Sequence, residues 1–154
     1  MFRLKQVVKS IFCKSCVGCC RFKEKESVWV PHLLEQETKS LKIKKIKLIF
    51  RNDQFICSFL EPEANLCRIY KIRPFECRLY PFLLQRRDDR LFIAVHLKCP
   101  FLEREVSCGD FKDYLKYLKA FFKRPKNLKI IMKNKNNFSY YPKDEIKELE
   151  PLGC

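Results

Sequence analysis

Four cysteines stand within eight residues near the start of the chain, as Cys13, Cys16, Cys19 and Cys20 in the pattern C-x2-C-x2-C-C. Two residues between thiols let one turn direct both sulfurs at a common centre while backbone amides point back at them. This spacing is typical of zinc knuckles and iron-sulfur loops. Because adjacent side chains diverge, Cys19 and Cys20 cannot easily point the same way, and we expect one of them to reach a different set of ligands.

The chain has 10 cysteines in 154 residues, which indicates either a disulfide framework or thiolates on metal. The apolar residues of the first twelve positions are interrupted by Arg3, Lys5 and Lys9, so no export signal is recognisable. No stretch approaches the roughly 18 uncharged apolar residues of a membrane-spanning helix. We therefore expect a cytoplasmic protein without a membrane span, whose reduced thiols bind metal.

A second set of cysteines, Cys57, Cys67 and Cys77, is spaced ten residues apart, and Cys99 follows before a proline. The first cluster matches the first three cysteines of a bacterial ferredoxin run, whose remaining cysteine precedes proline. Cys99 is a candidate for that ligand. A zinc knuckle, and a reversible disulfide between Cys13 and Cys16, are the competing interpretations of the first cluster.

Short motifs surround the second set: C-x-F-L at Cys57, C-x-I-Y at Cys67, R-P-x-x-C-R at Arg73 and Y-P-F at Tyr80. Together with the first cluster, the chain resembles the CxxCxxCC cysteine-cluster family, described as zinc- or iron-chelating, over roughly residues 13 to 99. The resemblance implies a centre of zinc or an iron-sulfur cluster with eight ligands: Cys13, Cys16, Cys19, Cys20, Cys57, Cys67, Cys77 and Cys99. The cluster region is also distantly similar to that of flagellin lysine N-methylases.

Three arginines interleave with these cysteines: Arg68, Arg73 and Arg78. Thiolates keep a net negative charge after metal binding, and guanidinium donors to sulfur would offset it, so we predict that these arginines help to bind the cofactor. We expect Tyr70 and Tyr80 to pack over the site.

Other candidate groups are assigned no ligand role. His32 and His96 are expected to be structural. Cys108 lies outside the motif and is either a buried apolar cysteine or a spare ligand, whereas Cys154 is an incidental terminal thiol. No catalytic residue can be assigned.

The fold class expected is α+β, a small single domain with a β-hairpin and short helices organised around the metal centre. Alternating apolar residues and the turn at Asn52-Asp53 predict a hairpin over residues 46 to 60, and residues 91 to 97 predict another strand. The clearest helix begins at Gly109-Asp110, with Asp110 as its N-cap, carries an aromatic stripe and ends before Pro125.

Other segments give weaker patterns. We expect a short helix over residues 2 to 12, an extended segment over 28 to 30 and a helix from Pro31 to Leu41. Residues 133 to 137 are expected to form a loop, and the last residues a short helix or a poorly ordered tail. This divides the chain into a cysteine-cluster domain, 1–125, and a basic C-terminal extension, 126–154.

The sequence carries a formal net charge of +15, which permits binding to nucleic acid but does not establish it. The favoured function is a metal-binding protein whose centre is structural or redox-active, with a protein partner and at most weak nucleic-acid binding. One alternative is an iron-sulfur-dependent enzyme related to protein lysine methylation. The other is a zinc-stabilised nucleic-acid or protein adaptor. Nucleotide-binding and hydrolase motifs are absent from the sequence.

Overall fold

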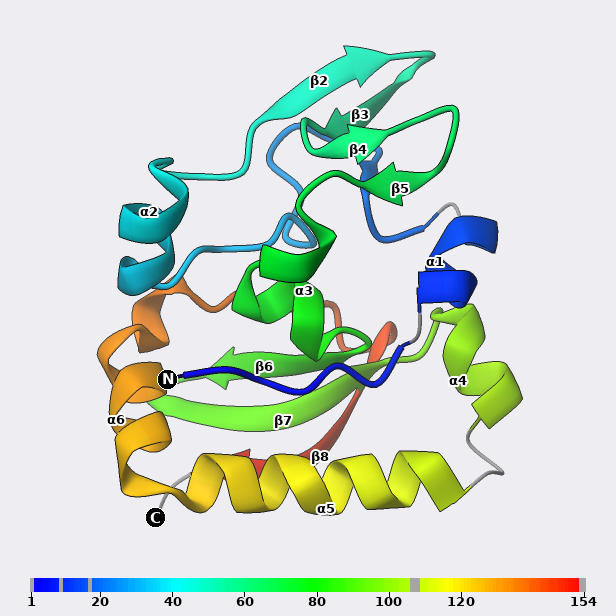
Figure 1. The fold of residues 1–154 in the computed structure, drawn as a ribbon. Coiled ribbons are helices and arrows are strands. Elements are labelled where there is room, and N and C mark those ends of the chain that lie inside the picture. Colours follow the sequence, from blue (N-terminus) through cyan, green and yellow to red (C-terminus); the bar gives the residue numbers. More distant parts are fainter. Residues whose placement is uncertain (1, 9, 17, 106–108, 153–154) are drawn as a thin grey trace.

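A computed structural model describes residues 2–8, 10–16, 18–105 and 109–152 of the chain. Helices and three small antiparallel sheets form one α+β domain, as predicted (Figure 1). The larger sheet, with α5 beneath it in that view, makes the lower part, and short strands make a cysteine-bearing upper part.

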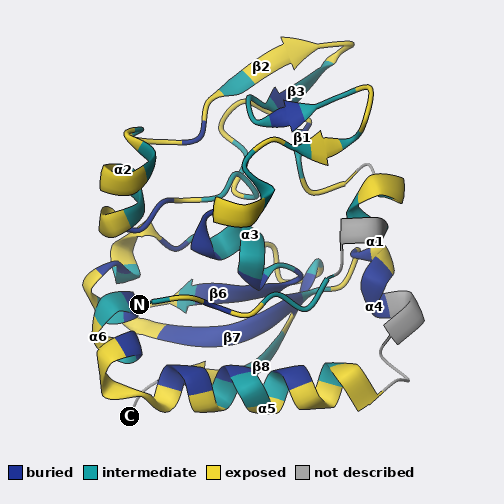
Figure 2. Cartoon of the chain, in the orientation of Figure 1, coloured by how far each residue is buried: buried dark blue, intermediate teal, exposed yellow. Residues whose placement is uncertain are grey.

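The larger sheet has the strand order β6-β7-β8, from Phe82–Arg87, Arg90–His96 and Ile146–Leu152. Phe82 pairs with Val95 and Arg87 with Arg90 across a hairpin, and all pairings in the sheet are antiparallel. The central strand β7 is almost entirely buried, which Figure 2 shows in dark blue. Such a strand reads as a continuous apolar run, here Leu91 to Val95, because both of its faces are covered.

The main apolar core lies between this sheet, α3 (Phe75–Leu79), α5 (Gly109–Lys123) and α6 (Pro125–Lys133). Phe82, Leu118 and Ile131 are each 0% exposed at its centre. The extended segment of residues 2–8 runs beside β6 and buries Leu4 in the same core (Figure 1). Residues far apart in the sequence thus close one core that contains none of the eight motif cysteines.

The upper part is built from very short strands. One sheet has the order β1-β3-β2, from Arg21–Phe22, Gln54–Cys57 and Leu48–Arg51. The other pairs β4, Leu60–Glu61, with β5, Leu66–Cys67. The remaining elements are α1 (Ser10–Ser15), α2 (Glu35–Leu41), η1 (Tyr70–Ile72), α4 (Pro100–Glu105) and η2 (Lys135–Asn137).

The strongest sequence signals are confirmed. The hairpin β2-β3 turns at Asn52 and Asp53, whose φ values of 50° and 58° are the left-handed pair that a tight two-residue hairpin needs. The second predicted strand is β7, and α5 ends at Lys123, before Pro125. Four residues of its aromatic stripe are buried: Tyr114, Leu118, Phe121 and Phe122.

Several weaker predictions are wrong at the N-terminal end and around α5. Residues 2–8 are extended and the first helix is α1, because the apolar side chains here pack against the core instead of forming a helical face. Residues 28–30 form turns, and α2 begins at Glu35, well after Pro31. Asp110 lies in the first turn of α5 and is not its N-cap.

The C-terminal quarter is more regular than its composition indicates. Pro125 ends α5 and also opens α6, a position where proline needs no amide hydrogen. Part of the loop predicted at 133–137 is the short helix η2. The last described residues form β8, which pairs with β7 rather than forming a helix or a tail.

Length and polarity of the described helices rule each of them out as a membrane-crossing segment.

Candidate metal centre

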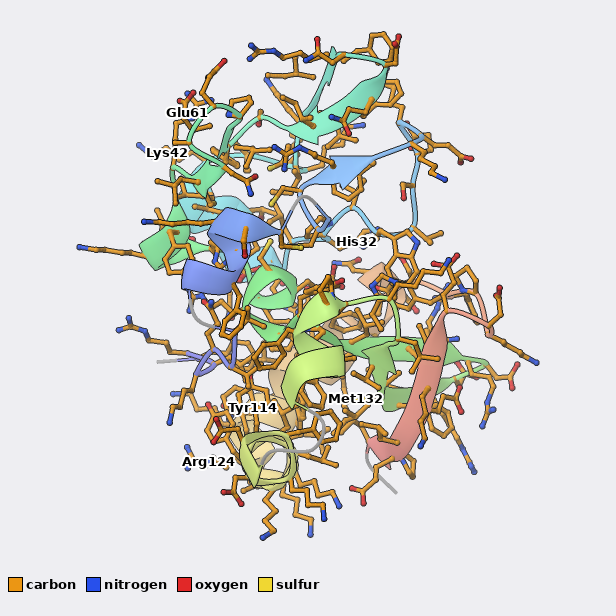
Figure 3. All side chains as sticks on the ribbon, turned by 90° about the vertical axis from the view of Figure 1, so that its right-hand side faces the viewer. His32, Lys42, Glu61, Tyr114, Arg124 and Met132 are labelled. Carbon is orange, nitrogen blue, oxygen red and sulfur yellow. The ribbon has the colours of Figure 1, made fainter. Side chains whose placement is uncertain are left out.

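The eight motif cysteines come from six places in the fold. The first cluster occupies α1 and the turn that leads into β1, and Cys57 and Cys67 end β3 and β5. Cys77 lies in α3, and Cys99 stands between β7 and α4. In Figure 3, sulfur atoms gather in the middle of the molecule, near α1 and α3.

Strand pairing joins the two cysteine sets directly. β1 follows Cys20 and pairs with β3, with Arg21 opposite Ile56. The backbone amide of Cys57 also donates to the carbonyl of Cys20 at 3.0 Å. The end of the first cluster is therefore fixed to the start of the second by main-chain hydrogen bonds.

Asn65, in the turn between β4 and β5, anchors the first cluster through its side chain. Its Nδ2 donates to the carbonyls of Cys13 at 2.9 Å, Lys14 at 2.9 Å and Cys16 at 2.7 Å, while its Oδ1 accepts from Arg21 at 2.7 Å. Sequence reasoning missed this residue. The available signal was an asparagine in a tight turn, where it tolerates the left-handed backbone, φ 50°, seen here.

Two carboxylates hold α3, the helix that carries Cys77. Glu76 accepts from the backbone amide of His32 at 2.7 Å, and Glu37 accepts from the amide of Phe75 at 2.6 Å. Glu37 also accepts from the amide of Leu34 at 3.0 Å. These bonds tie α3 to α2 and to the loop before it, so Cys77 is presented from a fixed helix.

The thiols influence one another across the two sets. Burial raises the pKa of Cys77 well above its ordinary value, and neighbouring Cys57, Cys19 and Cys67 raise it further. Burial also raises the pKa of Cys13, followed by the effect of Cys19. Metal binding requires thiolates, so it must displace protons from these groups and strengthen as pH rises.

Cys19 acts electrostatically on thiols that lie outside the first cluster. A hydrogen bond to Cys20 raises the pKa of Cys19 most, followed by burial. Cys19 is exposed as a residue. Cys19 in turn raises the pKa values of Cys67, Cys77 and Cys99 from three different elements.

Backbone amides point at the sulfurs of the second set. Burial raises the pKa of Cys57, and hydrogen bonds from the amides of Phe59 and Leu60 oppose that rise. Burial likewise raises the pKa of Cys67 against a bond from the amide of Ile69. Amides two and three residues beyond a cysteine stabilise its thiolate and are a recurrent feature of metal-thiolate loops.

Arg73 is buried beside the thiols without sufficient partners. Arg73 is only 8% exposed, and its Nε and Nη2 donate to no group in the described residues. It lies over the ring of Tyr70, 4.0 Å from the centroid. Burial and, after it, Cys19 raise the pKa of Cys13, and the charge and hydrogen bond of Arg73 act in the opposite direction. A buried cation with two unpaired donors is costly unless negative charge faces it.

The two other arginines lie differently. Arg68 is exposed and donates through Nη2 to the carbonyl of Ser58 at 2.8 Å. Burial lowers the pKa of Arg78, with Glu37 acting against that shift and Arg3 and Arg73 adding to it. Only Arg73 therefore combines burial with unpaired donors near the sulfurs among these described arginines.

Tyr80 connects Cys99 to a histidine. Burial raises the pKa of Cys99, while bonds from the amides of Phe101 and Leu102 and from the Tyr80 hydroxyl lower it. Burial raises the pKa of Tyr80 as well, with Cys99 as the next contribution. The Tyr80 hydroxyl is also 2.8 Å from Nδ1 of His96. Tyr80 thus packs over the site, as predicted, and also hydrogen-bonds one of its thiols.

Neither histidine is assigned a place among the sulfurs. His96 stacks on Trp29 with centroids 4.0 Å apart and faces Glu145, and burial lowers its pKa. His32 is 3.7 Å from Glu76, whose hydrogen bond raises the pKa of that imidazole. Both have local partners that account for their positions.

As they stand, no three His, Cys, Asp or Glu side chains in the described residues are grouped closely enough to hold a metal ion. Cys108 and Cys154 lie outside those residues. The surroundings nevertheless fit a thiolate centre, because amide donors face the sulfurs and Arg73 lacks the negative charge that thiolates would supply.

Comparison with known proteins identifies the class. Residues 12–109 match the model of the CxxCxxCC family, described as a "Putative zinc- or iron-chelating domain". The chain belongs to this family, whose description supports metal binding in general. The resemblance to this family that the sequence motifs indicated is thereby confirmed.

One relative is an uncharacterised protein of Methanocaldococcus jannaschii, 34% identical over 70 residues. The matched region covers 44% of this chain and 38% of that relative. No solved structure matches the chain.

Proposed function

We propose that the eight motif cysteines hold a zinc or iron-sulfur centre with a structural or redox role. The observation that carries the proposal is the buried guanidinium of Arg73, which has two unpaired donors beside thiols from both cysteine sets. Thiolates on a metal would supply the negative charge that this cation lacks. Reduced thiols also accord with a cytoplasmic location, which we infer on this basis.

Different groups of the chain would have different roles in binding the metal. Asn65 and the β1-β3 pairing hold the first cluster against the second, and α3 presents Cys77 from below. Amides after Cys57 and Cys67 stabilise the thiolate forms, and Arg73 offsets their charge. When bound, the metal supplies the ligand bonds that draw these six places together, so binding and folding of the upper part are linked.

Metal content and the absorption spectrum of anaerobically purified protein test the proposal. We expect stoichiometric metal: a brown protein if the centre is iron-sulfur, and a colourless one if it is zinc. Cys19→Ser and Cys77→Ser should each lower total metal by more than one site's share, because each thiol interacts electrostatically with thiols of the other set.

Cys154→Ser is the matched control, since it removes a thiol outside the motif, and it should leave the metal content unchanged. Metal-free protein from an anaerobic preparation supplied with zinc and iron would contradict the proposal. Clean loss of one site, with the rest intact, would contradict the sharing of ligands between the two sets.

A further inference from the structure

A second feature of the molecule adjoins Tyr70, the tyrosine whose ring Arg73 covers. A cavity of about 550 Å³ opens where the N-terminal segment passes η1, α3 and α5. Its size falls in the usual range for small-molecule sites, roughly 300–1,000 Å³. Four cations line it, Arg3, Lys5, Lys71 and Arg78, together with Tyr70 and Tyr117.

The charge of this cavity is one-sided. No carboxylate is among its lining residues, and within the described ranges none of the four cations forms a salt bridge. The nearest counter-charge to Arg78 is Glu37, whose oxygens already accept two backbone amides. Like charges gathered in a concavity repel one another, and a bound anion relieves that repulsion.

The two tyrosines add neutral donors. The hydroxyl of Tyr70 accepts from Nε2 of Gln6 at 2.8 Å, and that of Tyr117 accepts from the backbone amide of Lys5 at 2.8 Å. A phenol that accepts a hydrogen bond keeps its own hydrogen to donate. Among the described residues neither hydroxyl donates to an acceptor, so the hydrogen of each is free for a ligand.

The walls are fixed before any ligand binds. Tyr114 and Tyr117 of α5 hold Lys5 by its carbonyl and its amide, respectively, which keeps the N-terminal segment against the helix. Figure 1 shows that segment passing between α3 and α5. A preformed site loses less free energy to ordering on binding than a flexible one.

We propose that this cavity binds a small polyanion, a phosphate ester or a polycarboxylate, through its four cations and two tyrosine hydroxyls. The site is distinct from the eight thiols, although Arg78 follows Cys77 in α3: its lining residues contain no cysteine, and its ligand is recognised by charge and by hydrogen-bond donors. Guanidinium and ammonium groups both suit oxyanions, the guanidinium through paired donors.

Another cavity of the structure, which also contains cations, can be compared with this one. It measures about 230 Å³ and includes Arg21 and Arg51, but Arg51 pairs with Glu63 at 2.9 Å and Arg21 donates to Asn65 at 2.7 Å. Its cations are already engaged, so it should not bind a small anion.

Calorimetric titration of the metal-loaded protein with phenyl phosphate and, separately, with succinate tests the proposal. Both probes are weak chelators, and metal content measured before and after titration shows whether the centre stays intact. We expect saturable binding of at least one probe at low salt. Arg78→Gln and Lys71→Gln should each weaken it roughly tenfold to hundredfold, as expected for loss of a charged hydrogen bond.

Arg51→Gln is the matched control, because it also removes one positive charge, and it should leave the affinity unchanged. Binding that survives both cavity variants, or falls equally in the control, would overturn the proposal in favour of general charge attraction. Tighter binding of a single-stranded oligonucleotide with the same variant sensitivity would overturn it in favour of a nucleic-acid surface. Lys71 is exposed on η1 and is not part of α3, so its variant keeps the test valid if Arg78→Gln fails to fold.

Discussion

Removing the metal with a chelator is expected to unfold the upper part of the molecule and leave the β6-β7-β8 sheet with α5 intact. The lower part has its own core, centred on residues such as Phe82 and Leu118. The apolar clusters formed by the described residues include no residue of β1 to β5, and in these strands only Phe22, Ile56 and Leu60 are buried. These strands are two to four residues long, and Phe50 is 62% exposed.

Such short strands are not stable without additional ties. In small zinc domains the apparent free energy of metal binding is on the order of 10 kcal/mol, enough to decide whether the upper part folds. Hydrogen exchange with and without metal checks this: amides of β1 and of residues 48–67 should lose protection, and those of β7 and α5 should keep it.

Leu118→Ala is the complementary variant. It should destabilise the lower part by about 2–5 kcal/mol, because it leaves a cavity at a fully buried position, while the metal content stays unchanged. Exchange that is unaltered by chelation in β1 and in residues 48–67 would contradict the account, as would equal loss of protection in β7.

Replacing Arg73 by methionine is expected to weaken metal binding by roughly tenfold to hundredfold, the usual effect of losing a group that supports metal ligands. The same change should leave the metal-free protein as stable as before, or more stable. Its two unpaired buried donors cost about 1–3 kcal/mol each, which together match or exceed the roughly 2 kcal/mol of a desolvated contact with the Tyr70 ring.

Opposite signs in the two states distinguish this role from simple packing. Affinity is measured by competition with a metal chelator of known strength, and stability by denaturant unfolding of the metal-free form. Arg68→Met is the control, since Arg68 is exposed and bonds to a carbonyl, and it should change either quantity little. A fall in metal-free stability as large as the loss of affinity would show that Arg73 is structural.

The parts of the fold that the sequence predicted are those specified locally. Asn52-Asp53 determines the β2-β3 hairpin through its turn chemistry, and the stripe from Phe111 to Phe122 determines α5 through its period. The N-terminal segment could not be predicted in this way, because Leu4 is buried by a surface that residues far along the chain create.

The strand β8 could not be predicted from the sequence for a related reason. Its charged residues face outward along an edge strand, and Pro151 suits an edge, where one side of the backbone needs no partner. Read alone, such a stretch resembles a polar tail. It becomes a strand only because β7 offers it an unpaired neighbour.

For the site, spacing alone singled out the cysteines, and their alternation with arginines indicated Arg73. Asn65 holds the first cluster through contacts that span 49 to 52 residues of the sequence. Tyr80 bonds to His96, which lies in a different element. No local sequence pattern encodes either contact.

X-ray absorption at the metal edge of anaerobically purified protein tests the central claim most directly. The account predicts a coordination shell made only of sulfur, at about 2.3 Å if the metal is zinc. A shell containing nitrogen or oxygen from the protein, or a sulfur shell that persists unchanged after both Cys19→Ser and Cys77→Ser, would contradict it.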